Sequence, residues 1–230
     1  MSVALVTGGS AGLGLALTRA LVTDGWQVVT DARHAAALER AVADLGEAVV
    51  PVPGDVSDPT HRADLAAVVR RLGRLDLLVH GASTLGPLPM RPLRALEPEE
   101  LDRVWSVNAA APMALTRELL PVLVESRGVL LSISSDAAVE HYETWGAYAA
   151  TKAALDHLTL TLAAEEGIAA YAVDPGDMRT AMHQDAFPGE DISDRPLPET
   201  VVPALLELVR RRPRAGRLRA SDLARPEAAR

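Results

Sequence analysis

The chain has 230 residues, of which 48% are hydrophobic and only 3% aromatic, and its formal net charge is −8. This length fits one core of alanine, valine and leucine, and the acidic balance argues against a general nucleic-acid or membrane-surface binder. With no cysteine, the chain has no disulfide, thiolate nucleophile or cysteine-ligated metal, and we expect no metal site. No apolar run reaches the roughly 18 residues of a membrane span, and no basic signal-peptide region opens the chain, so we expect a cytoplasmic protein.

Short apolar stretches alternate with segments of helical spacing along the chain. Strands are predicted at 3–7, 28–30, 49–52, 75–79, 128–134, 168–173 and 215–220. Helices are predicted between them at 13–23, 35–45, 59–72, 98–105, 109–126, 146–164 and 199–211. The alternation predicts an α/β fold, in which a parallel sheet of about seven strands is covered by helices on both faces.

We expect one domain over residues 1–220 and a C-terminal tail at 221–230. The proline-rich segment 85–96 reads as a loop, because proline interrupts a helix. Residues 178–198 contain three prolines and no periodic pattern. Such long loops are uncommon unless they bind something, so we expect an irregular lid over a substrate there.

A glycine-rich loop joins the first predicted strand to the first predicted helix, with the sequence Thr7-Gly8-Gly9-Ser10-Ala11-Gly12-Leu13-Gly14. Glycine lets a backbone approach a pyrophosphate closely, and the following helix N-terminus offers free N–H groups and a positive dipole end. The loop therefore indicates dinucleotide binding, and the alternative is an ordinary tight turn.

Tyr148 and Lys152 lie four residues apart in a predicted helix, so both side chains share one helix face. A free phenol has a pKa of about 10, and a neighbouring ammonium stabilises the phenolate. We therefore expect Lys152 to lower the pKa of Tyr148 toward about 7. Lys152 is the only lysine among 23 basic residues, and Ser135 precedes Tyr148 by 13 positions.

The glycine loop, Ser135 and the Tyr148-x-x-x-Lys152 pair together resemble the short-chain dehydrogenase/reductase family. The likeness extends to Asp55-Val56, to Asn108, and to Pro175-Gly176 with Thr180, so it runs from Val3 to about Ala220. It implies a Rossmann-like, doubly wound sheet in a three-layer αβα sandwich. It also implies an NADP(H)-dependent oxidoreductase that interconverts a carbonyl compound and a secondary alcohol.

The resemblance assigns roles to four catalytic residues. Tyr148 would be the general acid or base, Lys152 would lower its pKa and bind the nicotinamide ribose, and Ser135 would bind the substrate oxygen. Asn108 would bend its helix and hold a proton-relaying water. The cofactor-binding residues that it implies are Thr7, Gly8, Ser10, Gly12, Leu13, Gly14, Asp31, Arg33, Asp55, Val56, Ala82, Tyr148, Lys152, Pro175, Gly176, Met178 and Thr180.

The end of the second predicted strand reads Asp31-Ala32-Arg33 and bears on the choice of cofactor. An acid here binds the 2′-hydroxyl of NAD, whereas an arginine accommodates the phosphate of NADP. The family's NAD-type acid falls on Ala32 and its NADP-type arginine on Arg33. Asp31 is one step early, which turns a strand side chain to the other face. We expect NADP(H) rather than NAD(H), although Ala11 supplies no second basic marker.

The expected substrate is a small or medium carbonyl compound or alcohol, and the acidic lid disfavours a strongly anionic one. The family's asparagine pair after the fourth strand is replaced by His80-Gly81, and we expect His80 to be packed or hydrogen-bonded rather than catalytic. The residues expected to form the substrate pocket are Leu85, Gly86, Asp136, His141, Tyr142, Trp145 and Met178.

Three alternatives remain open at the level of sequence. The first two are the same chemistry with NAD(H), and a catalytically silent dinucleotide-binding sensor or partner subunit. The third is an epimerase or dehydratase of longer related families, for which 230 residues leave no substrate domain. The resemblance implies a homodimer or homotetramer. The arginines at 210–219 are expected to cap a helix and pair with acids rather than bind nucleic acid.

Overall fold

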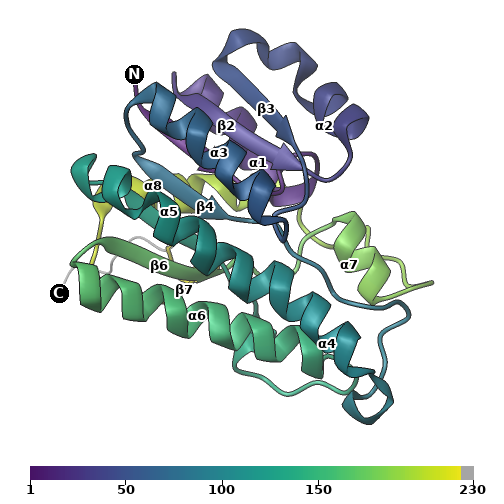
Figure 1. Cartoon of the computed structure of the whole chain (residues 1–230). Helices are drawn as coiled ribbons and strands as arrows, with labels where there is room; N and C mark the ends of the chain where they lie inside the picture. The colour runs from purple at the N-terminus through teal and green to yellow at the C-terminus, as the bar shows by residue number, and fades with distance from the viewer. Residues whose placement is uncertain (224–230) are drawn as a thin grey trace, which may run out of the picture.

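A seven-stranded parallel sheet forms the centre of the computed structural model, which describes residues 1–223 (Figure 1). The strand order is β3-β2-β1-β4-β5-β6-β7. The strands are β1 (Val3–Val6), β2 (Gln27–Ala32), β3 (Val49–Pro53), β4 (Leu77–His80), β5 (Val129–Ile133), β6 (Ala169–Asp174) and β7 (Gly216–Arg219). The predicted doubly wound α/β fold is confirmed.

Helices cover both faces of the sheet and bury two separate apolar layers against it. One layer is contributed by α1 (Gly12–Thr23), α2 (Ala35–Val42) and α8 (Val202–Arg211), with the short α9 (Ala220–Leu223) beside them. The other is contributed by α3 (Pro59–Leu72), α5 (Ala111–Glu125) and α6 (Gly146–Glu166). The remaining helices are α4 (Pro98–Trp105) and α7 (Ala181–Ala186).

The burial of the strands explains their sequences. Every residue of β1 and β4 is buried, because helices pack on both faces of these central strands. The edge strands β3 and β7 are only partly buried and carry proline or arginine instead. Burying a leucine such as Leu5 or Leu78 completely contributes about 1.5–3 kcal/mol relative to leaving it exposed.

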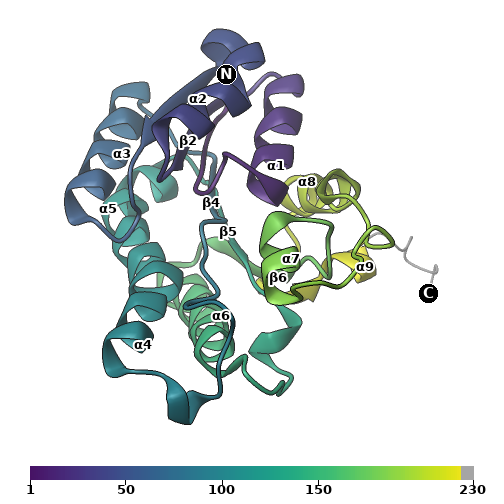
Figure 2. The ribbon, with the colours of Figure 1, turned by 90° about the vertical axis from the view of Figure 1, so that its right-hand side faces the viewer.

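The strand order determines where a ligand-binding crevice forms in this fold. The chain leaves β1 toward β2 on one side, whereas β4 pairs with β1 on the other side. Loops therefore diverge at the carboxyl ends of β1 and β4, where open α/β sheets bind their ligands. Helix α7 lies at this edge, on the right in Figure 1 and toward the viewer in Figure 2.

Two segments differ from the sequence-based expectation. The stretch 178–198 was expected to be irregular, yet residues Ala181–Ala186 form α7. Thr180 caps the start of this helix, because its side chain accepts a hydrogen bond from the backbone N–H of His183 at 3.2 Å. The helix was not predicted because its six residues are too few to show a helical period of apolar residues. The predicted helix 109–126 is preceded by a π-helical turn at Ser106–Ala110 that joins it to α4.

The C-terminal end is described only in part. Residues Ala220–Leu223 of the segment beyond β7 form α9, and the rest of the predicted tail, 224–230, lies outside the described residues. Among residues 1–223, none of the helices is both long enough and apolar enough to cross a membrane.

Candidate active site

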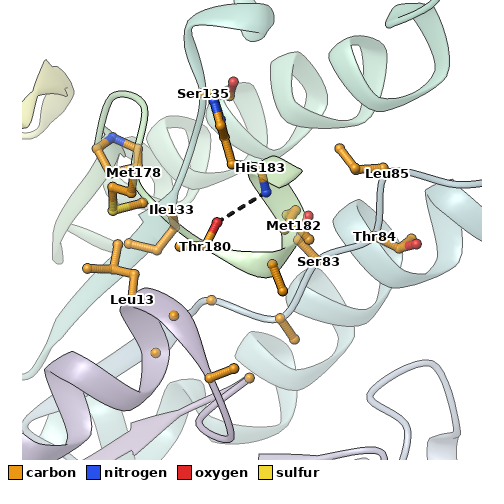
Figure 3. Close-up of a pocket in the computed structure, with 18 of the residues that line it drawn as sticks. Leu13, Ser83, Thr84, Leu85, Ile133, Ser135, Met178, Thr180, Met182 and His183 are labelled. Atoms are coloured by element: carbon orange, nitrogen blue, oxygen red, sulfur yellow. Dashed lines mark hydrogen bonds between the residues drawn. The ribbon is translucent and has the colours of Figure 1, made fainter. Parts of the chain in front are cut away.

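A cavity opens at the carboxyl edge of the sheet, between the glycine loop, the ends of β4, β5 and β6, and α7 (Figure 3). Twenty of the residues singled out from the sequence line it together. They are Gly8, Ser10, Gly12, Leu13, Gly14, Asp31, Arg33, Asp55, Val56, Ala82, Leu85, Ser135, Asp136, Trp145, Tyr148, Lys152, Pro175, Gly176, Met178 and Thr180. The cofactor and substrate predictions therefore converge on one site.

The glycine loop is a tight cradle in which side chains do not fit. A Cβ on Gly14 would collide with the carbonyl oxygen of Gly8, and one on Gly8 would lie 2.9 Å from the backbone nitrogen of Ala82. The residue before helix α1, Ala11, makes no side-chain cap, so the first N–H groups of the helix remain free for a ligand. This geometry suits an anionic group at the helix N-terminus.

Asp31 lines the cavity and also holds the glycine loop in place. Its buried carboxylate accepts a hydrogen bond from the backbone N–H of Gly8 at 2.8 Å and contacts His61 Nε2 at 3.0 Å. Its backbone carbonyl oxygen also accepts from the N–H of Gly9 at 2.8 Å. Asp31 therefore ties the glycine loop to β2, and His61 of α3 secures it from the opposite side.

Polar side chains surround the end of the cavity beyond β2. Arg33, His34 and Asp55 all line it. Burial alone would raise the pKa of Asp55, but hydrogen bonds from Ser57 and the charges of Arg103 and Arg33 outweigh it. The pKa of Asp55 therefore lies below its ordinary value, and its carboxylate accepts from Arg103 at 3.1 Å.

Tyr148 is buried, with 7% of its surface exposed, beside Leu85 and Ala137. Burial raises the pKa of its phenol to about 12, and a hydrogen bond with Ser135 opposes that rise. The expected fall of the Tyr148 pKa toward about 7 is therefore not found, because burial outweighs the groups that favour the phenolate. Lys152 Nζ donates to the carbonyl oxygen of Ile133 at 2.7 Å and lies 5.5 Å from the centre of the phenol ring.

Lys152 is itself buried, and its surroundings make it easier to deprotonate. Burial lowers the pKa of Lys152 to about 8, while the negative charge of Asp156 works against that fall. Asp156 lies one further turn along α6, and its carboxylate accepts from Ser134 at 2.8 Å. This contact also separates the roles of two neighbouring serines, because Ser135 faces Tyr148 and Ser134 faces Asp156.

Asn108 fixes the π-helical turn to the loop after β4. Its amide donates to the carbonyl oxygen of Thr84 at 2.9 Å and to Thr151 Oγ1 at 3.0 Å, and its carbonyl accepts from the N–H of Thr84 at 2.9 Å. Asn108 is 1% exposed and does not line the cavity. It holds the Thr84 loop against α6, which also carries Tyr148 and Lys152.

Thr7 and His80 stabilise the start of the loop that follows β4. Thr7 Oγ1 accepts from the N–H groups of Gly81 at 3.1 Å and Ala82 at 3.2 Å, which supports the position where asparagine was expected. His80 is buried and contacts Thr116 Oγ1 at 2.7 Å. Burial, together with the charge of Lys152, lowers the pKa of His80 to about 3, so it is neutral and packed as expected.

Not every predicted pocket residue reaches the cavity, and some lining residues were missed. His141 and Tyr142 are exposed outside it, although the Tyr142 hydroxyl donates to Asp136 at 2.8 Å. The lining residues that the sequence-based prediction missed include His34, Ser83, Thr84, Asp174, Asp177 and His183. The position of Ser83 and Thr84 directly after β4 is a usable signal, whereas His183 depends on the unpredicted helix α7.

Dinucleotide-binding α/β proteins combine such a glycine loop with a crevice at the strand ends, and comparisons with known proteins agree. The short chain dehydrogenase family matches residues 2–191. The chain is 34% identical over 192 residues to a short chain dehydrogenase of Pseudocercospora fijiensis, covering 78% of this chain and 60% of that protein. It is 32% identical over 182 residues to a serine 3-dehydrogenase of Agrobacterium fabrum, covering 76% and 72%.

A solved structure gives the same result in three dimensions. A short chain dehydrogenase of Shigella flexneri, complexed with NADP, matches with a TM-score of 0.89 at 29% identity, covering 96% of this chain and 97% of that chain. The chain therefore belongs to the short-chain dehydrogenase/reductase family. It is an oxidoreductase that uses NAD(H) or NADP(H) and acts on CH–OH or C=O groups.

Proposed function

We propose that this protein is an NADP(H)-dependent oxidoreductase that interconverts a carbonyl compound and a secondary alcohol, with Tyr148 as the general acid and base. One observation carries the proposal. Tyr148, Ser135 and Lys152 meet in the cavity that the glycine loop also lines. A sensor or partner subunit that only bound a dinucleotide would have no chemical need for these three groups together.

The cavity suits a phosphorylated dinucleotide. The backbone around Gly8 and Gly14 is packed so closely that neither position has room for a side chain. The N-terminus of α1 offers N–H groups to a pyrophosphate. The buried carboxylate of Asp31 is engaged by Gly8 and His61, which leaves it less available to a ribose hydroxyl. Arg33 lies on the cavity wall, and this supports NADP(H) over NAD(H).

The chemistry divides between cofactor and protein. When bound, the nicotinamide gives or takes the hydride. Tyr148 donates its phenol proton to the carbonyl oxygen during reduction and recovers a proton from the hydroxyl group during oxidation. Ser135 holds the same oxygen, and the hydrogen bond between its hydroxyl and Tyr148 favours the phenolate.

Lys152 supplies the positive charge that this proton transfer needs. A phenol with a pKa of about 12 is almost entirely protonated at neutral pH, so the loss of its proton needs a group that stabilises the phenolate. The Lys152 ammonium, already 5.5 Å from the ring centre, stabilises the phenolate that forms. Asn108 and Thr84 position the loop that faces α6, and a water held at this junction would pass protons to solvent through Lys152.

Replacing Tyr148 by phenylalanine tests the proposal. We expect Tyr148→Phe to keep its fold and its affinity for NADPH, measured by nicotinamide fluorescence, while turnover of a ketone panel falls about 100-fold or more. Tyr171 of β6 lies outside the cavity and its hydroxyl donates to the carbonyl oxygen of Pro213, so Tyr171→Phe is the matched control and should keep turnover. Normal turnover by Tyr148→Phe would refute the assignment of the acid and base.

The same titration separates the alternatives. Tighter binding of NADPH than of NADH supports the assignment of Arg33. Tighter binding of NADH would mean the same chemistry with NAD(H). Binding of a dinucleotide without turnover of any carbonyl compound or alcohol would favour the silent sensor or partner subunit.

A further inference from the structure

Asp136 stands directly after Ser135 and lines the cavity beside the reacting groups. One carboxylate oxygen accepts hydrogen bonds from Ser135 Oγ at 3.0 Å and from the N–H of Ala137 at 2.7 Å. The other accepts from the Tyr142 hydroxyl at 2.8 Å. All three donors are neutral, so they orient the carboxylate without cancelling its charge.

The other carboxylates at this end of the cavity each face a cation. Asp177 lies 3.6 Å from Arg195, and Asp174 lies 3.8 Å from Arg217. Among residues 1–223, no lysine, arginine or histidine comes within 4.0 Å of the Asp136 carboxylate. The substrate end of the cavity therefore presents one negative charge that the described chain leaves uncompensated.

Aromatic side chains collect around this carboxylate in a chain that has few of them. Of its seven phenylalanine, tyrosine and tryptophan residues, four form one cluster here. Trp145 lies at its centre, with ring centres at 5.7 Å from Tyr148, 5.8 Å from Phe187 and 6.1 Å from Tyr142. Aromatic faces attract organic cations, and Trp145 itself lines the cavity.

We propose that the substrate is an α-amino ketone or the matching 1,2-amino alcohol, with an apolar or aryl body, and that Asp136 selects it by binding its ammonium group. The inference rests on the function proposed above. When Ser135 turns its single hydroxyl proton from Asp136 to the substrate oxygen, that oxygen lies within about two hydrogen-bond lengths, or roughly 6 Å, of the Asp136 carboxylate. An ammonium on the carbon next to the reacting one is then close enough to bond this carboxylate, while Trp145 contacts the body.

The proposed reaction leaves the nitrogen unchanged. In reduction, the hydride from NAD(P)H adds to the carbonyl carbon and the Tyr148 proton goes to its oxygen, so the ketone becomes a secondary alcohol and the ammonium keeps all its bonds. The negative charge of Asp136 opposes ionisation of Tyr148. An ammonium beside Asp136 offsets that charge and favours the proton transfer, whereas a carboxylate in its place is repelled.

Three phenyl ketones of similar size test the inference. Protonated 2-(dimethylamino)-1-phenylethanone carries the cation, isovalerophenone replaces its nitrogen by carbon, and phenylglyoxylate carries a negative charge. We expect kcat/KM for the amino ketone to exceed that for isovalerophenone at least about tenfold, which is about 1.4 kcal/mol, with phenylglyoxylate the poorest. Asp136→Asn should remove the preference for the cation, while Asp177→Asn, whose carboxylate already faces Arg195, should keep it.

A binding measurement keeps the inference testable if turnover fails. The alcohols that correspond to the first two ketones are titrated into the protein saturated with NADPH or NADH, and thermal unfolding is followed. We expect the amino alcohol to stabilise the wild type more than its carbon analogue, and Asp136→Asn to lose the difference. Equal binding, equal kcat/KM or a preference that survives in Asp136→Asn would overturn the inference. Failure to turn over any ketone while the amino alcohol binds through Asp136 would instead overturn the proposed reductase function.

Discussion

His80 gives the chain a pH-dependent stability. It is buried and contacts Thr116 Oγ1 at 2.7 Å, and burial together with the charge of Lys152 lowers its pKa from 6.5 to about 3. As the pH falls below 6.5, the unfolded chain takes up this proton before the folded chain does. The contribution of His80 to stability is therefore complete above pH 6.5 and is lost on acidification toward pH 3.

The size of the effect follows from the same values. Each pH unit below the unfolded pKa costs about 1.36 kcal/mol, so at pH 5, which is 1.5 units below 6.5, the loss is about 2 kcal/mol. His80→Gln keeps a polar group near Thr116 but cannot gain the proton. We expect the unfolding free energy of wild type, from urea titration, to fall about 2 kcal/mol more than that of His80→Gln between about pH 7.5 and 5.

An exposed histidine supplies the control. His157 lies on the outer side of α6, so His157→Gln should leave the pH dependence of wild type unchanged. Parallel curves for wild type and His80→Gln over this range would refute the reasoning. So would an NMR titration that placed the pKa of His80 near its ordinary value.

Two further predictions concern the cofactor end of the cavity. Arg33→Ala should weaken NADPH roughly 10- to 100-fold in a fluorescence titration and leave NADH nearly unchanged, because it removes one charge-assisted contact; equal weakening of both would place Arg33 elsewhere than at the phosphate. Gly14→Ala should reduce the affinity for both cofactors and lower the unfolding free energy by about 1–3 kcal/mol, because its Cβ meets the Gly8 carbonyl oxygen; unchanged binding would show that the loop can move aside.

The sequence was informative where the relevant residues are close together in the chain. The glycine loop follows β1 directly, and Tyr148 and Lys152 share one helix face, so local spacing was enough to predict them. Asp31 shows the limit of such reasoning. Its position one step before Ala32 can be read from the sequence, but its partner His61 lies 30 residues away on α3, and only the packing of this helix against the sheet brings them together.

The pKa of Tyr148 could not be predicted from spacing for a related reason. Lys152 stands at the expected distance along α6, yet burial of the phenol dominates, and the ammonium donates to the carbonyl oxygen of Ile133 instead. Desolvation depends on everything that encloses a group, including Leu85 and Ala137 from other segments. A pair of residues four apart therefore predicts which groups meet, and the fold decides the sign of the shift.

Strand β7 connects the C-terminal arginines to α6, the helix that carries Tyr148 and Lys152. Arg217 of β7 donates to Asp156 at 2.9 Å and to the carbonyl oxygen of Ser135 at 2.8 Å. Asp156 in turn accepts from Ser134, so one carboxylate joins α6, β5 and β7 behind the cavity. Removing one partner of a largely buried ion pair leaves a charge without compensation, which is costly. Arg217 therefore fixes the backbone of Ser135, and a strand at the edge of the sheet helps to hold the hydroxyl that faces Tyr148.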